Sequence, residues 1–386
     1  MVSSDHASRS ARLRELALLF LRLGSTAFGG PAAHIALMEE EVVQRRGWLS
    51  RERFLDLLGA ANLIPGPNST EVAIHIGHAR AGWPGLVVAG LSFIVPAAAI
   101  VTACAWAYVR FGALPAFAGF LYGVKPVVIV IVAQALWRLG RTAIRSVWLG
   151  ALALAAAAAN AFGADEIGVL AASAGLSVFV KLGREHARRA APLTGMGALG
   201  VGATSVSSAA FGLWPLFFFF AKVGSVLFGS GYVLLAFLRS GLVEQRGWLT
   251  EAQLLDAVAV GQVTPGPLFT TATFVGYVIA GPAGAAVATL GIFLPAFAFV
   301  AASAPFLPRL RESPTAGALL DGVNAASLAL MAVVTVQLAR AAFADPLALG
   351  LAAAAGVALL ARPGWSSAWL VFAGGVIGLL SGRVWP

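Results

Sequence analysis

The sequence predicts an all-α, polytopic membrane protein made of two homologous repeats, each with two broken or re-entrant helices followed by about four spans. Composition is the first reason. Hydrophobic residues make up 59% of the 386 residues and charged residues 11%, against roughly 25% in soluble domains. A soluble protein could not keep so many apolar side chains from water, so a soluble enzyme is excluded. Disorder is excluded too, because disordered chains combine low hydrophobicity with high charge.

An internal repeat is the second reason. The 47 residues from Gly24 match the 47 from Gly224 with 16 identities and no gap, and the offset then becomes 199, with Gly82 matching Gly281. The repeated features include Arg-Gly-Trp-Leu, an aspartate at Asp56 and Asp256, and Pro-Gly-Pro. We divide the chain into a tail (1–11), a first repeat (12–182), a linker (183–211) and a second repeat (212–386).

Paired helix breaks are the third reason. A spanning helix needs about 20 apolar residues, and runs of suitable length lie near 84–109, 115–137, 147–163 and 166–182, then near 281–304, 315–338, 345–361 and 366–382. Ahead of these runs, Phe28-Gly29-Gly30-Pro31 and Pro65-Gly66-Pro67 must interrupt helices. Ser50 and Thr250 are expected N-caps.

These breaks predict a transporter site for an anion. Inside hydrocarbon, non-helical backbone is tolerated only where protein buries it or where it lines a wet cavity, and paired breaks in two repeats mark such sites. Helix N-termini favour anions. One Pro-Gly-Pro could equally be a packing kink, but its duplication favours a site. The expected substrate-binding residues are Gly29, Gly30, Pro65, Gly66, Pro67, Asn68, Ser69, Thr70, Gly229, Ser230, Gly231, Pro265, Gly266, Pro267, Thr270 and Thr271.

Five further residues are candidates for charge or coupling roles: Arg22, Lys222, Lys125, Glu71 and His34. Arg22 and Lys222 either attract the anion or extend to the membrane interface. Lys125 is interpreted as the boundary of a span, and His34 as a hydrogen-bonded core histidine. Glu71 either couples protons to transport or repels the anion.

The remaining polar residues predict no cofactor, no metal and no nucleic-acid partner. Glu39 to Glu41 are expected at a solvated helix end. His75 and His78 lack a third ligand, and Cys104 stands alone in an apolar run. The net charge of +9 is divided among short clusters between apolar runs, which is typical of membrane topology rather than of a nucleic-acid patch.

Several motifs in order resemble the chromate ion transporter family, in its long two-domain form. They are Phe28-Gly29-Gly30-Pro31-Ala32-Ala33-His34-Ile35, Arg46-Gly47-Trp48-Leu49, Pro65-Gly66-Pro67-Asn68-Ser69-Thr70, Phe228-Gly229-Ser230-Gly231, Arg246-Gly247-Trp248-Leu249, Thr264-Pro265-Gly266-Pro267 and Gly276-Tyr277. The resemblance implies a multi-pass bacterial inner-membrane protein, an inverted duplication, and export of chromate from the cytoplasm with chromate resistance. The implied partners are the bilayer, chromate and its analogue sulfate, and a homodimer is left open. Glu71 departs from the neutral amide expected there, and Leu268-Phe269 does not match Asn68-Ser69.

Three rival functions remain to be compared. A carrier of sulfate or another oxyanion would use the same donors, and an anion channel would use the same scaffold. An intramembrane enzyme is disfavoured, because all five histidines precede Gly229-Ser230-Gly231 and no HExxH motif occurs. No P-loop is present, so an ion gradient rather than ATP is expected to drive transport.

Overall fold

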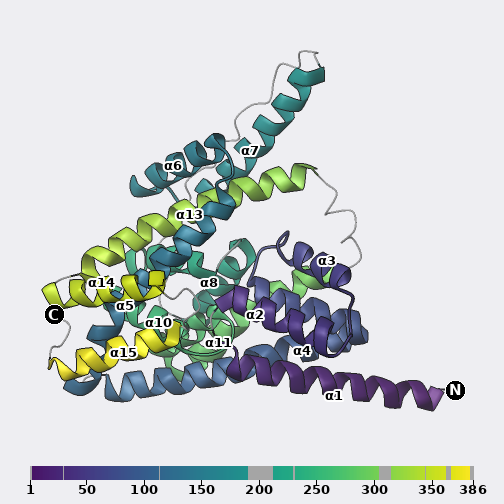
Figure 1. The fold of residues 1–386 in the computed structure, drawn as a ribbon, viewed down its shortest axis with the longest axis horizontal. Helices are drawn as coiled ribbons and strands as arrows, with labels where there is room; N and C mark the ends of the chain where they lie inside the picture. The colour runs from purple at the N-terminus through teal and green to yellow at the C-terminus, as the bar shows by residue number, and fades with distance from the viewer. Residues whose placement is uncertain are drawn as a thin grey trace.

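The computed structural model describes residues 2–28, 30–112, 114–189, 212–228, 231–303, 314–343, 345–361 and 367–382. Every regular element in these ranges is helical, which confirms the all-α prediction (Figure 1). Most of the predicted linker, residues 190–211, lies outside the described residues.

The two repeats contain the same series of helices. The first repeat comprises α1 (Val2–Thr26), α2 (Gly30–Glu39), the π-helical η1 (Glu40–Arg45), α3 (Arg51–Ala61), α4 (Asn68–Phe111), α5 (Pro115–Ala143), α6 (Val147–Ala161) and α7 (Glu166–Arg189). The second comprises α8 (Leu213–Val226), η2 (Gly231–Val233), α9 (Leu234–Leu238), η3 (Arg239–Glu244), α10 (Glu251–Val263), η4 (Leu268–Thr270), α11 (Thr271–Ser303), α13 (Pro314–Ala342), α14 (Pro346–Ala361) and α15 (Ser367–Leu380). Both predicted breaks occur in both repeats.

The first break of the first repeat is the tip of a re-entrant helical hairpin. Arg22 of α1 pairs with Glu41 of η1 at 2.7 Å, and nearer the tip the His34 ring nitrogen Nε2 lies 3.1 Å from the Ala27 carbonyl oxygen. Nested contacts of this kind require α1 and the α2–η1 segment to run antiparallel. The chain therefore turns back between α1 and α2, as a re-entrant segment must.

The long helices α4 and α11 each fold back on themselves as well. Backbone angles leave the helical region at Ala81–Gly82 and at Ala280–Gly281. A Cβ atom on Gly77 would lie 2.2 Å from the Gly85 carbonyl oxygen, so the two parts of α4 touch backbone to backbone. Each of these helices is thus a short helix following the Pro-Gly-Pro break and packed against a longer one, which is the span expected from the sequence.

The length and surface of these helices are those of a multi-pass membrane protein. Five helices in the described ranges are long and apolar enough to cross a bilayer, and four shorter apolar helices accompany them. Large apolar side chains also face outward, among them Trp83, Trp106, Trp137, Trp214 and Trp369, each more than half exposed. Lipid is the solvent that accommodates such a surface.

The repeats run in opposite directions and interdigitate. Gly90 of α4 faces Phe297 on the longer arm of α11, whereas Tyr108, further along α4, meets Phe274. Phe274 lies on the short arm of α11, where its neighbour Thr273 is 2.7 Å from Thr289 of the longer arm, so Tyr108 lies level with an earlier part of that longer arm. These equivalent helices are therefore antiparallel, so the duplication is inverted. In addition, α5 packs on α14 and α15 of the second repeat, and α13 packs on α6 and α7 of the first (Figure 1). Each repeat thus completes the other.

Candidate functional site

The hairpin tips of the two repeats are joined by a reciprocal pair of hydrogen bonds. The Gly66 N–H donates to the Leu227 carbonyl at 2.8 Å, and the Gly266 N–H donates to the Ala27 carbonyl at 2.9 Å. Each bond links the Pro-Gly-Pro break of one repeat to the first break of the other. All four predicted breaks therefore lie together where the two repeats face each other.

Only glycine fits at the centre of each Pro-Gly-Pro. Gly66 has φ +141° and Gly266 has φ +90°, in the region that side chains rarely adopt. A Cβ atom on Gly66 would lie 2.3 Å from Glu71 Oε1, and one on Gly266 would lie 2.4 Å from Ala97 Cβ. The flanking residues Pro65, Pro67, Pro265 and Pro267 have no N–H to donate. Their part is to hold the bend, so they cannot act as anion donors.

The short helices that follow the breaks begin with unused backbone donors. In the described part of the chain, the N–H groups of Asn68 and Ser69 have no acceptor, and those of Leu268 and Phe269 have none either. Such groups at a helix N-terminus bind oxyanions well. The hydroxyl of Thr70 is fully buried and likewise has no partner among these residues. The structure therefore brings unsatisfied donors to the point where the tips meet.

The polar side chains around these donors differ between the repeats. The Thr270 hydroxyl donates to the Pro267 carbonyl and the Thr271 hydroxyl to the Leu268 carbonyl, both at 2.8 Å. Their protons are thus engaged within the backbone in this conformation. The Asn68 amide donates to Asn62 across the break at 2.8 Å, so it braces the hairpin instead of facing an anion.

The first breaks contribute backbone in both repeats. Gly30 begins α2 with φ +77°, and Gly231 begins η2 in contact with Leu268 and Phe269. Gly231 thus lies beside the short-helix donors of its own repeat. The other three predicted residues of these breaks, Gly29, Gly229 and Ser230, lie outside the described residues.

Two titratable side chains of the first repeat lie at the joined tips. Glu71 is fully buried, its Oε1 lies against Gly66, and neither carboxyl oxygen has a hydrogen-bond partner in the described ranges. His34 is 1% exposed and contacts the Ala27 carbonyl that also accepts the Gly266 N–H, which confirms the interpretation of a hydrogen-bonded core histidine. In the second repeat Leu234 corresponds to His34 and Thr271 corresponds to Glu71. The titratable side chains therefore come from the first repeat alone, and the site is chemically asymmetric.

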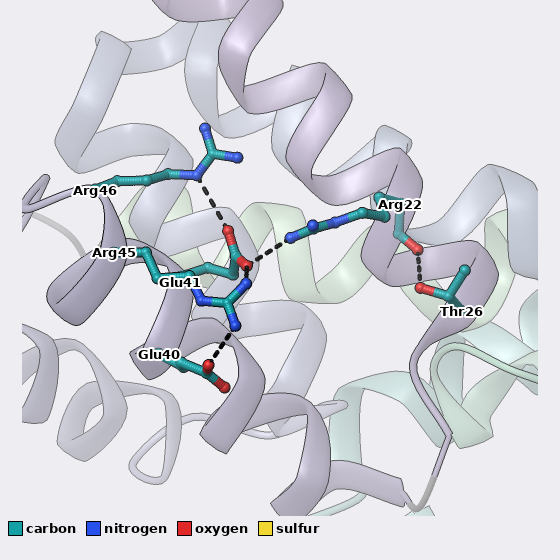
Figure 2. Close-up of polar contacts among 6 residues, drawn as sticks. All are labelled: Arg22, Thr26, Glu40, Glu41, Arg45 and Arg46. Carbon is teal, nitrogen blue, oxygen red and sulfur yellow. Dashed lines mark hydrogen bonds and ion pairs between the residues drawn. The ribbon is translucent and has the colours of Figure 1, made fainter.

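Arg22 belongs to a cluster that the sequence did not predict. Figure 2 shows the Glu41 carboxylate surrounded by the guanidinium groups of Arg22, Arg45 and Arg46, at 2.7, 3.0 and 3.2 Å. The side chain of Glu41 is 8% exposed, so the expectation of a solvated helix end is wrong for this residue. The reversal of the chain between α1 and α2 brings η1 back along α1 and buries the carboxylate between arginines.

The arginines of this cluster keep the Glu41 carboxylate charged. Burial raises the pKa of the Glu41 carboxyl, but hydrogen bonds from Arg22 and Arg46 and the charges of Arg22 and Arg45 outweigh it and leave the pKa below its ordinary value. The carboxylate therefore stays ionised and is shared by Arg22, Arg45 and Arg46. Lys222, the counterpart of Arg22, is exposed and has Gly241 where Arg22 has Glu41, so the second repeat offers a cation without that carboxylate.

The interpretation of Lys125 as the boundary of a span is also wrong. Lys125 lies within α5, its side chain is 3% exposed, and it pairs with Asp256 of α10 at 3.2 Å. Tyr108 of α4 donates to the other carboxylate oxygen of Asp256 at 2.9 Å. Sequence reasoning missed Asp256 and Tyr108 as site residues. The repeated aspartate, Asp56 and Asp256, was the available signal.

Comparisons with known proteins agree with this architecture. The sequence model of the family described as chromate transporter matches residues 14–182 and 214–379. A chromate transport protein of Cupriavidus metallidurans is 34% identical over 394 residues, with 98% of this chain and 95% of that protein covered. One from Pseudomonas aeruginosa is 35% identical, with 83% and 80% covered. No solved structure matches the chain. Two matched regions, together spanning most of the chain, establish that it belongs to the chromate transporter family.

Proposed function

We propose that this protein is a secondary active transporter that exports chromate from the cytoplasm. It holds the anion at the N-termini of the short helices that follow the Pro-Gly-Pro breaks, between the repeats 12–182 and 212–386. The supporting observation is the reciprocal bonding of Gly66 to Leu227 and of Gly266 to Ala27. Two inverted repeats whose tips meet at one axis can rock against each other and expose that point to either side in turn.

The chemistry at the tips suits a tetrahedral dianion. Asn68, Ser69, Leu268 and Phe269 offer backbone N–H groups with no acceptor among the described residues, and the helix dipoles add positive potential. The unpartnered Thr70 hydroxyl supplies a further donor. Release of the Gly66 and Gly266 N–H groups from the opposite repeat, as the tips part, would add two more.

Transport rather than enzyme chemistry is the role we assign, with no cofactor. Relatives that cover most of this chain are named as chromate transport proteins. Chromate is therefore the first substrate to test. Sulfate is also a tetrahedral dianion and would bind to the same donors, so sulfate transport at the same site is the second candidate function. An anion channel is the third.

The test is chromate flux into everted membrane vesicles from cells that lack other chromate exporters. We expect chromate to accumulate, sulfate to compete, and an uncoupler to collapse the gradient. Replacement of Pro265-Gly266-Pro267 by three alanines should abolish the flux without preventing membrane insertion. Sulfate accumulation without chromate accumulation would change the substrate. Downhill flux that an uncoupler does not affect would point to a channel.

A further inference from the structure

The buried ion pair between Lys125 and Asp256 links helices of both repeats. Lys125 is on α5 of the first repeat and Asp256 is on α10 of the second, with side chains 3% and 5% exposed. Tyr108 of α4 completes the group through its hydrogen bond to Asp256. Within the described ranges, Lys125 is the only lysine or arginine among the buried residues.

These three residues line a cavity of about 450 Å³. A water molecule occupies about 30 Å³ of liquid, so the space holds a five-atom oxyanion together with several waters. The rest of the wall is largely apolar, with the Gln253 amide as a further donor: Val109, Gly112, Ala118, Leu121, Ala252 and Val278. A cation, a hydroxyl and an amide that converge on one apolar chamber form a typical small-ligand site.

Stability does not explain the ion pair. Burying two charges costs several kcal/mol per ion, and apolar residues often replace such a pair without loss. Nor does the repeated fold require it, because Asp56 is the counterpart of Asp256 whereas Asn324 is the counterpart of Lys125. A lysine placed inside a membrane protein in one repeat alone indicates function.

We propose that this cavity is a second oxyanion site, in which the anion displaces the Asp256 carboxylate from the Lys125 ammonium while Asp256 takes up one proton from the buffered solution. The inference rests on the proposed function, because it adds a proton-linked step to the same transport. Before binding, Lys125 and Asp256 neutralise each other. After binding, Lys125 faces the dianion, neutral Asp256 needs no counter-ion, and Tyr108 can turn its hydroxyl to an anion oxygen.

The groups that face Asp256 limit which residues can take part. Of the helices packed against α10, α5 presents Lys125 and α4 presents Tyr108. Neither α9 nor α15 contains a titratable residue. Arg239 and Glu244 of η3 pair with each other, and Arg239 also pairs with Glu251 at the start of α10. The titratable residue of α11 is Tyr277, next to a wall position of the cavity. Lys125 and Tyr108 are thus the groups that contact the Asp256 carboxylate.

This exchange sets the charge that moves in transport. A dianion that leaves with one proton still carries one negative charge outward. The inside-negative membrane potential therefore drives export, and a proton gradient directed inward opposes it. The coupling is built into the site, since the anion and the proton bind together.

The test is calorimetry of chromate binding to the purified full-length protein in two buffers with different protonation enthalpies. We expect the wild-type protein to take up about one proton with each chromate bound at this site. Asp256→Asn should bind chromate without linked proton uptake. Lys125→Gln should bind about tenfold more weakly or worse, as expected on loss of a charged hydrogen bond. Asp56→Asn, the matched change in the first repeat, should behave as the wild type.

Two results would overturn the inference. The first is unchanged affinity in Lys125→Gln together with unchanged proton uptake in Asp256→Asn. The second is wild-type binding by the double variant Lys125→Gln/Asp256→Asn, which removes both charges without leaving either one unpaired. If Gly266→Ala also loses chromate binding in either of these cases, the cavity is refuted as a binding site and the proposed site at the hairpin tips remains. If sulfate binds in a way that depends on Lys125 and Asp256 while chromate does not bind, chromate is refuted as the substrate and the cavity is supported as an oxyanion site.

Discussion

Replacing Gly266 by alanine tests whether the joined tips carry transport. A Cβ atom there would lie 2.4 Å from Ala97 Cβ and 2.9 Å from the Gly24 carbonyl oxygen, both on the opposite repeat. Neither contact involves the end of a flexible side chain, so the tip must withdraw. Withdrawal stretches the bond from the Gly266 N–H to the Ala27 carbonyl.

The magnitude follows from two contributions. An alanine at φ +90° costs roughly 1–2 kcal/mol of backbone strain, and a weakened backbone hydrogen bond costs about 0.5–1.5 kcal/mol. Together they disfavour the closed tip arrangement by roughly 2–3 kcal/mol, or about 30- to 150-fold in its population. We expect chromate transport to fall by a similar factor.

Gly247→Ala is the matched control for this experiment. Gly247 has φ +61° and nothing within 4 Å of its added Cβ, so it shares the backbone strain but touches no opposite repeat. Flux in everted vesicles, normalised to inserted protein, should fall in Gly266→Ala far more than in Gly247→Ala. Equal flux in the two variants, whether both high or both low, would refute the reasoning.

Three other changes probe the charged residues. Lys222→Gln should raise the apparent KM for chromate more than Arg22→Gln does, because Arg22 is already paired with Glu41; the reverse order would contradict this assignment. Glu41→Gln should destabilise the protein by roughly 1–2 kcal/mol near neutral pH, with partly exposed arginines as partners. Since the pKa of Glu41 is lowered on folding, this difference should be complete above the ordinary value of 4.5 and vanish as the pH falls through the folded value, as denaturation across pH would reveal. Glu71→Gln should leave the melting temperature unchanged or higher, because the described residues give its carboxyl no partner; a large drop would show an unrecognised partner.

Local signals in the sequence gave the elements correctly. Proline and glycine placed the breaks, and apolar length placed the spans. Ser50 and Thr250 are the N-caps expected, each accepting a backbone N–H at 3.1 Å. Thr250 also forms a full capping box with Gln253. These features depend on neighbouring residues alone, which is why one sequence suffices to predict them.

Features that depend on distant residues could not be read in this way. Gly82 served only to align the repeats, although it is where α4 folds back. Glu41 was expected at a solvated helix end because no residue near it in sequence indicates that η1 packs along α1 and pairs Glu41 with Arg22. The partners Lys125 and Asp256 lie in different repeats, and the bonds that join the tips do as well. Their pairing depends on how the two repeats pack against each other, and the repeat along the chain does not specify those contacts.

The exchange of helices between the repeats bears on how the protein is made. Gly123 of α5 fits against the backbone of α15 at Gly374 and Gly378, about 250 residues later in the chain. At about 5–20 residues per second, synthesis of α15 follows that of α5 by roughly 12–50 seconds. During that interval the newly inserted first half presents to lipid a face shaped for another helix. We therefore expect insertion factors that shield faces of small residues to change the yield of folded protein more than the stability of the finished fold. The same holds for a slower rate of translation before α15.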